Sequence, residues 1–436
     1  MAKSSGRKKS NSSSPAQSGD ANGVARDYWE NHLQMCIDPW LQNAADPQYM
    51  RRWLGDLNKR HLRMLCEYLG VDWDAKLEEQ RESLLACNGR LTPYYLVERF
   101  AYRRSRFAVS DYAATVLAKP DFENCRSGET FDTLALLLAL YHKSPEHLRT
   151  VYHLEKVHST GFARMKLKGR ARKPKKSFNE FLTHTFLKRL LAQFDAHRDD
   201  GRASELMNIV PDADHPVAFI RREEQRSMLL RLSRAVHGFK PEWIILDFRD
   251  NGKRVDISSH SMSVPLELAN RIASEYFGKD CEYVNEVEVT PNALIDKFLD
   301  LLTRDAIEFL KLVEVHVKNS PLDGAPVLKI SSEGDESVAG GVRHFEKVIG
   351  ALLADLDLIK AIKVLFCGKR VKLTLEAVPD APEGYCVRYT DKTLNKRERD
   401  AFETKVREEP YGIRVLSTEK RHKQARGRLS VAASPE

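Results

Sequence analysis

The chain has 436 residues, which is long enough for two or three domains of ordinary size. Its 42% apolar and 30% charged residues indicate real hydrophobic cores under a heavily solvated surface. A formal net charge of +8 and an isoelectric point of about 9.0 favour polyanionic partners, such as nucleic acid or an anionic membrane surface. The longest apolar run, residues 134–141, is far shorter than the roughly 20 residues that cross a bilayer. We therefore expect a buried helix there and no membrane span.

The seven cysteines are odd in number and contain no CxxC pair, so we expect free thiols in a reducing compartment. No Cys/His cluster has the spacing of zinc ligands, and we predict neither a metal site nor a cofactor. The polar N-terminus lacks the apolar core of a secretory signal. These features predict a cytoplasmic protein, or a nuclear one if the source is eukaryotic.

Residues 1–24 are polar and show no periodicity, which predicts a disordered basic tail. From residue 25 to residue 160 the apolar pattern predicts a helical domain. Within it, residues 62–86 predict two helices, with Gly70 ending the first and a short extended link between them. This pair resembles the helix–link–helix of SAP-type DNA-binding modules, over fewer than thirty residues and without their usual second glycine. The resemblance assigns no role to any single residue.

Residues 92–117 begin with a Thr-Pro helix start and place aromatic side chains between arginines, including Arg103 and Arg104. Such a mixture can hold a single nucleic-acid strand, with phosphates on the cations and bases stacked on the rings. The alternative is an ordinary amphipathic helix, with its aromatics in the core and its arginines in water.

The basic stretch, residues 164–176 (RMKLKGRARKPKK), has eight Lys or Arg among its thirteen residues and no acid. Its glycine, its proline and its charge repulsion argue against a stable helix, so we predict a basic linker over residues 161–177. Ser177 and Glu180 then have the spacing of a capping box, which starts the next helix.

Residues 178–238 are predicted as a helical segment, in which the second helix covers residues 217–237. The pattern changes at residue 243, and residues 239–378 predict an α+β domain or domains with two strong hairpins. The hairpins share a Phe…Gly-Lys-Arg-Val pattern, which is either chance or the trace of two related units. Residues 379–436 predict a polar basic tail with one short helix.

Both hairpins place basic residues directly after the turn glycine. Lys253 and Arg254 follow the first turn, and Lys369 and Arg370 follow the second. Two basic hairpin ends could contact phosphate groups. Charges beside turns also simply keep exposed hairpin ends soluble.

The chain contains no Walker loop, no GxGxxG after a strand, no GxSxG elbow, no HExxH and no kinase motif set. The best catalytic candidate resembles the metal site of restriction-type nucleases, in which a carboxylate precedes a strand with Glu-x-Lys. Its members are Asp305, Glu314, His316 and Lys318. His316 stands where that pattern has lysine, and strand alternation alone places the last three residues on a solvent face.

The sequence thus predicts an α+β, mostly helical protein. An all-α N-terminal domain precedes a mixed C-terminal half, in which β-hairpins pack on amphipathic helices. The favoured function is a non-catalytic nucleic-acid-binding or nucleic-acid-associated accessory protein, with DNA or RNA as partner and other protein subunits possible. The alternatives are a protein-interaction subunit of a larger assembly and a divergent metal-dependent nuclease. The main predicted phosphate contacts are Arg164, Lys166, Lys168, Arg170, Arg172, Lys173, Lys175 and Lys176.

Overall fold

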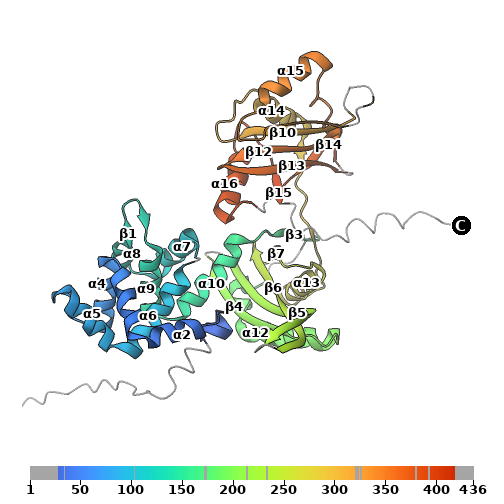
Figure 1. Cartoon of the computed structure of the whole chain (residues 1–436). Helices are drawn as coiled ribbons and strands as arrows, with labels where there is room; N and C mark the ends of the chain where they lie inside the picture. The colour runs from blue at the N-terminus through green and yellow to red at the C-terminus, as the bar shows by residue number, and fades with distance from the viewer. Residues whose placement is uncertain are drawn as a thin grey trace, which may run out of the picture. The chain divides into compact units, whose positions relative to one another are not determined.

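The computed structural model describes residues 28–33, 35–102, 104–170, 174–212, 215–231, 234–319, 324, 327–378, 381–390 and 393–417. The chain divides into two compact units, Met1–Glu155 and Lys156–Glu436 (Figure 1). The predicted tail over residues 1–24 and the basic end of the chain beyond residue 417 lie outside the described residues.

The first unit is built mainly from helices. Its one ladder in the described residues joins β1 (Arg126–Ser127) and β2 (Thr130–Phe131), so the expected all-α domain is not confirmed. The helices are η1 (Tyr28–His32), α2 (Asp38–Ala45), α3 (Pro47–Asp56), α4 (Lys59–Leu69), α5 (Leu77–Ala86), α6 (Asn88–Ala101), α7 (Arg106–Val116), α8 (Lys119–Asn124), α9 (Thr133–Lys143) and α10 (Glu146–Ser159), the last of which runs on into the second unit.

Helix α9 forms the centre of the first unit, as its apolar sequence predicts. Its residues 135–140 are all buried, which is the pattern of a helix enclosed by others. Asp132 caps it by accepting hydrogen bonds from the amides of Leu134 and Ala135. Gly70 ends α4 at φ +71°, as predicted.

The single helix expected over residues 92–117 is wrong in its bounds. Helix α6 begins at Asn88 and carries Pro93 in its first turns, and the chain leaves the helix between Ala101 and Arg106. Tyr94, Tyr95 and Phe100 are buried, which agrees with the amphipathic alternative for this segment.

The second unit holds two antiparallel-rich sheets, called here the first sheet and the second sheet. The first sheet has the strand order β4-β5-β6-β7-β3-β8, with every neighbouring pair antiparallel. Its strands are β3 (Ala163–Leu167), β4 (Ser204–Asp212), β5 (His215–Arg231), β6 (Arg234–Arg249), β7 (Arg254–Ser258) and β8 (Tyr283–Asn285). Helices α11 (Phe178–Phe181), α12 (His184–Arg198) and α13 (Ser263–Phe277) contribute to one hydrophobic core with these strands.

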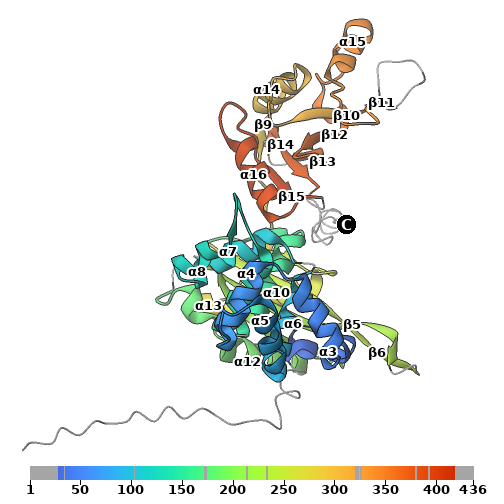
Figure 2. The same cartoon turned by 60° about the vertical axis from the view of Figure 1, so that its left-hand side comes forward.

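Two expectations for this region are wrong. The helix predicted over residues 217–237 is instead most of β5 and the start of β6, which pair over the long ribbon visible in Figure 2. The linker predicted over residues 161–177 contains β3, which lies between β7 and β8 in the sheet. In both cases strand pairing overrides the local pattern, with adjacent hairpin strands for β5 and β6 and with distant strands for β3.

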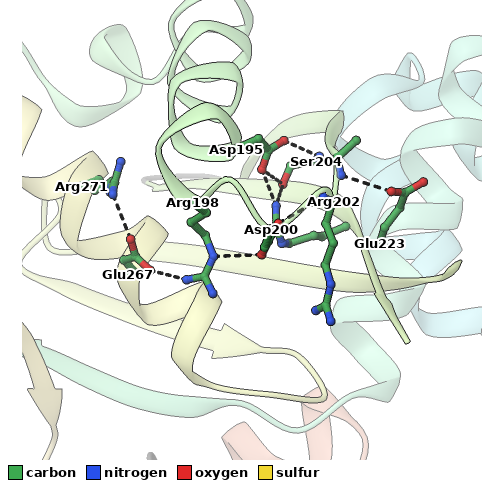
Figure 3. A network of polar contacts seen from close by, with 10 residues as sticks. Asp195, Arg198, Asp200, Arg202, Ser204, Glu223, Glu267 and Arg271 are labelled. Atoms are coloured by element: carbon green, nitrogen blue, oxygen red, sulfur yellow. Dashed lines mark hydrogen bonds and ion pairs between the residues drawn. The ribbon is translucent and has the colours of Figure 1, made fainter. Parts of the chain in front are cut away.

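A buried arginine joins α12 to the first sheet. Arg222 of β5 is fully buried, and its guanidinium donates to Asp200 at 2.7 and 2.8 Å, to Ser204 at 2.7 Å and to Asp195. Figure 3 shows Asp195, Asp200 and Ser204 converging on this point, with Arg198 and Glu267 continuing the network outward. Two carboxylates thus balance one enclosed cation.

The second sheet has the order β11-β10-β12-β13-β14-β15, with β9 also paired to β14. Its strands are β9 (Thr290–Pro291), β10 (Lys311–Lys318), β11 (Val327–Ser331), β12 (Ile359–Phe366), β13 (Lys369–Val378), β14 (Ala381–Tyr389) and β15 (Val415–Ser417), the last parallel to β14. Helices α14 (Asn292–Thr303), α15 (Ala339–Ile349) and α16 (Lys396–Arg407) share its core, and a short helix η2 (Leu356–Leu358) precedes β12.

The second hairpin and the short helix predicted within residues 379–436 are confirmed as β12–β13 and α16. Asn395 and Glu398 form a capping box at the start of α16. The polar tail predicted from residue 379 is wrong up to residue 417, because β14 and β15 are strands of the second sheet. In the part of the chain that the structure describes, no helix combines the length and the apolar character needed to cross a bilayer.

Candidate nucleic-acid interface

The basic stretch is tied to the first sheet at its N-terminal end. Strand β3 pairs with β7 on one side and β8 on the other. The amide of Leu167 then donates to the carbonyl of Lys253 at 2.8 Å, and the amide of Lys168 donates to the carbonyl of Glu282 at 2.8 Å. The backbone of the stretch therefore leaves the sheet beside the Asn-Gly turn that joins β6 to β7.

The other end of the stretch is held by Phe178, the first residue of α11. The capping box of Ser177 and Glu180 starts this short helix as predicted. The buried ring of Phe178 packs against Phe248 at 4.7 Å and Tyr276 at 4.8 Å between ring centroids. The hydroxyl of Tyr276 donates to the carbonyl of Lys176 at 2.9 Å. Both ends of the stretch are thus fixed around the same hairpin turn.

The turn itself depends on backbone conformations that favour glycine and asparagine. Asp250, Asn251 and Gly252 have φ values of +49°, +52° and +77°. The side-chain oxygen of Asn251 accepts from the amide of Phe178 at 3.5 Å, and Tyr283 donates its hydroxyl to the carbonyl of Gly252. A Cβ atom at Gly252 would lie 2.6 Å from the ring of Phe178, so the close packing of turn and helix requires glycine.

These contacts create a hollow of about 540 Å³, called here the lysine hollow. It brings Lys175 and Lys176 of the basic stretch together with Lys253 of the hairpin turn, residues that are far apart in the sequence. The hollow is lined by Pro174, Lys175, Lys176, Ser177, Glu180, Asp250, Asn251, Lys253, Tyr276 and Phe277.

The lysine hollow carries an excess of positive charge that can bind an anion. Its three lysines outnumber its two acids, of which Glu180 accepts from the amide of Ser177 at 3.1 Å and Asp250 pairs with Arg254 at 3.4 Å. Lys175, Lys176 and Lys253 are exposed, and within the described residues no carboxylate forms an ion pair with their side chains. An anion that enters the hollow therefore meets three cations that need not break a salt bridge first.

Three other predicted phosphate contacts form ion pairs with carboxylates of the protein itself. Arg164 pairs with Glu403 at 2.7 Å, Lys168 with Glu282 at 3.0 Å, and Arg254 with Glu286 at 3.1 Å. These three cations are therefore not part of the candidate interface. Lys166 and Arg170 stay exposed, whereas Arg172 and Lys173 lie outside the described residues.

The remaining predicted contacts are also structural where the structure describes them. Arg104 pairs with Glu155 at 2.7 Å, and Arg103 lies outside the described residues. Lys369 pairs with Glu398 at 2.6 Å, and Arg370 donates to backbone carbonyls, including that of Ser332 at 3.0 Å. The second hairpin end is therefore not a free basic surface.

Arginines that are each paired with a carboxylate line a second hollow of about 550 Å³ in the same unit. Arg249 and Asp256 of the first sheet approach to 3.2 Å, Arg407 of α16 and Glu288 to 3.2 Å, and Tyr389 donates to Glu403 at 2.6 Å. Each arginine that lines this hollow has a carboxylate partner. The arrangement joins the two sheets rather than presenting cations to a ligand.

Asp256, which faces this second hollow, predicts a particular pH dependence. Burial raises the pKa of Asp256 to about 6, although Arg164 and Arg249 act to lower it. The folded protein therefore keeps a proton that the unfolded chain loses near pH 4, so stability falls as the pH rises through that window. We expect the unfolding free energy of the wild type, relative to Asp256→Asn, to fall by on the order of 2 kcal/mol between pH 4 and pH 7. Urea denaturation of both proteins across this range measures the difference, and a constant or rising difference would contradict the assignment.

The nuclease candidate does not assemble. Asp305 follows α14 with φ +54° and accepts a hydrogen bond from Ser337. Glu314 on β10 instead binds Lys363 at 2.9 Å and Lys329 at 3.2 Å. Within the described residues no group of three or more His, Cys, Asp or Glu side chains could hold a metal ion. The pattern that suggested nuclease chemistry is a sheet face with paired charges.

Comparison with known proteins assigns the chain to no family. No family model matches the chain, and no curated protein matches it. The function of the lysine hollow is therefore inferred from the residues that line it. Sequence reasoning missed Asn251, Tyr276 and Phe277 as lining residues. The Asn-Gly turn was the one available signal, and it did not reveal that β3 brings the basic stretch to that turn.

Proposed function

We propose that the chain binds nucleic acid at the lysine hollow, through phosphate contacts and without a catalytic step. The observation that supports this is the meeting of Lys175 and Lys176 with Lys253 around one cavity, with no acid paired to them in the described residues. Lysine contacts to phosphate are independent of base sequence and release counterions. Half-buried Phe277 at the same hollow offers a ring on which an unpaired base can stack, which favours single strands.

The test is a titration of labelled single-stranded and double-stranded DNA and RNA at roughly 50 mM and 200 mM salt. The variant replaces the three lysines of the hollow: Lys175→Gln, Lys176→Gln and Lys253→Gln. We expect weaker binding and a shallower salt dependence. On duplex DNA the slope of log K against log salt should fall by up to about 2.7, at about 0.9 for each phosphate that the variant no longer neutralises.

A matched control separates this site from overall charge. Lys119, Lys297 and Lys347 are exposed lysines on α8, α14 and α15, and their replacement by glutamine removes the same charge. We expect this control variant to bind like the wild type. Equal losses in both variants would show that only net charge matters. Absence of binding by the wild type would overturn the nucleic-acid function and leave the protein-interaction hypothesis.

A further inference from the structure

One face of the second sheet packs against helices α14, α15 and α16, and the opposite face does not belong to this core. Val315, Ile362 and Leu373 alternate into the core shared with α14, α15 and α16. The residues between them point the other way, as the period of two in a strand requires. On this opposite face, called here the lysine face, lie Lys329 of β11, Glu314 and His316 of β10, Lys363 of β12 and Lys372 of β13.

The register places these side chains next to one another. His316 is opposite Lys329, Glu314 is opposite Lys363, and Lys363 is opposite Lys372. Adjacent strands lie about 4.8 Å apart, so the row from β11 to β13 covers about 14 Å. The lysine side chains keep water contact: those of Lys329 and Lys363 are 51% and 33% exposed, and Lys372 is exposed.

Cations outnumber the one acid of this row. Glu314, 7% exposed, is held between Lys329 and Lys363, and these lysines lower its pKa against the effect of burial. The pKa of His316 is lowered by burial and then by Lys360, a further exposed lysine of β12. The imidazole is therefore neutral at pH 7, and Glu314 alone faces the lysines as an anion.

The direct pairing of Lys363 with Lys372 is the informative feature. Like charges opposite each other on neighbouring strands destabilise a sheet. No core or cap requires a lysine at exposed position 372, so this repulsion brings no benefit to the fold. Lys363 already pairs with Glu314 at 2.9 Å, and an anion bound beside Lys372 would offset what remains of the repulsion.

We infer that the lysine face is a second nucleic-acid-binding surface, which contacts phosphate groups across strands β11, β10, β12 and β13. Nucleic acid fits better than a protein partner, because protein interfaces are depleted in lysine and enriched in aromatic side chains. The surface is distinct from the lysine hollow and does not require it. Glu314 then weakens the binding of nucleic acid, because phosphate must displace its carboxylate from Lys329 and Lys363.

The experiment uses the full chain carrying the three lysine substitutions of the hollow, so that only the lysine face is measured. The probe is a labelled single-stranded DNA oligonucleotide at low salt. Two further substitutions are made separately in that background. Lys372→Glu is expected to weaken binding about tenfold, because it replaces a phosphate contact by a repulsion. Glu314→Gln is expected to strengthen binding several-fold, because it frees two lysines while it keeps the shape of the side chain.

Net charge alone would also give opposite signs for these two substitutions, so a Lys→Glu substitution away from the lysine face is needed to separate the two explanations. Lys347→Glu, on α15 among the helices that share the core, is the control and should change binding by less than about twofold. Lys372 makes no pair with Glu314, so its variant remains informative if Glu314→Gln perturbs folding. Unchanged binding in Lys372→Glu would overturn the proposal. So would displacement of the DNA by poly-glutamate of equal charge, since the face would then recognise charge alone.

Failure of this proposal and failure of the proposed function are separable. If the hollow variant loses all binding before either new substitution is made, the lysine face is not a nucleic-acid surface, whereas the hollow is. If the hollow variant binds like the wild type and Lys372→Glu abolishes binding, the lysine face is the principal site and the hollow is not.

Discussion

Replacing Arg222 by methionine is expected to lower the free energy of unfolding of the second unit by about 3 to 5 kcal/mol. The guanidinium is fully buried and binds Asp195, Asp200 and Ser204. Its removal leaves Asp195 without its counter-charge and leaves Asp200 with Arg198 alone (Figure 3). The cost is dominated by these poorly compensated anions and not by the lost attraction.

Urea denaturation followed by circular dichroism measures the effect. Arg198→Met is the matched control, because Arg198 pairs with Asp200 at 3.2 Å and Glu267 at 2.6 Å but remains 30% exposed. We expect it to cost no more than about 1 kcal/mol. Adding Asp195→Asn and Asp200→Asn to Arg222→Met should restore much of the stability, since no buried charge then remains. Equal losses for Arg222→Met and Arg198→Met would refute this account.

Gly252→Ala is the second substitution with a large expected effect, about 2 to 5 kcal/mol of unfolding free energy. The residue has φ +77°, and a new Cβ atom would lie 2.6 Å from two ring carbons of Phe178. The ring must move, and it holds the end of the basic stretch. We therefore also expect weaker nucleic-acid binding at the lysine hollow, although no lysine has changed.

Gly169→Ala is the control for this prediction. Gly169 has a similar φ of +75°, but no atom of the residues that the structure describes is found within 4 Å of its Cβ position. It therefore carries the backbone strain of about 1 to 2 kcal/mol without the collision. Denaturation curves for both variants, together with DNA titrations, separate the strain from the collision. If the two substitutions cost the same, the packing of Phe178 on the turn is not what requires glycine at residue 252.

Local signals predicted many of the elements correctly. The capping box at Ser177, the αL stop at Gly70 and the alternation of β10 all depend on residues close in sequence. The helix predicted over residues 217–237 failed because charged residues and leucines in that segment mimic a helical face. Its strand conformation comes from pairing β5 with β6, which no local pattern encodes.

The candidate site was only half predictable. Charge counting identified Lys175, Lys176 and Lys253, but not that they share a hollow, because this depends on where β3 enters the sheet. Charge counting also placed Arg164 and Arg254 among the predicted phosphate contacts. Their carboxylate partners, Glu403 and Glu286, lie far away in the sequence, so ion pairing could not be read from composition.

The position of β3 has a consequence for synthesis of the chain on the ribosome. Leu167 pairs with Tyr283, so β3 finds its second neighbour only after more than 100 further residues have been made. At roughly 5 to 20 residues per second, that delay is on the order of 10 s. Until β7 has been made, the basic stretch has no strand to pair with, and the nascent chain carries these cations outside any sheet. Closure of the first sheet is thus a late and non-local folding event, and β8 completes it.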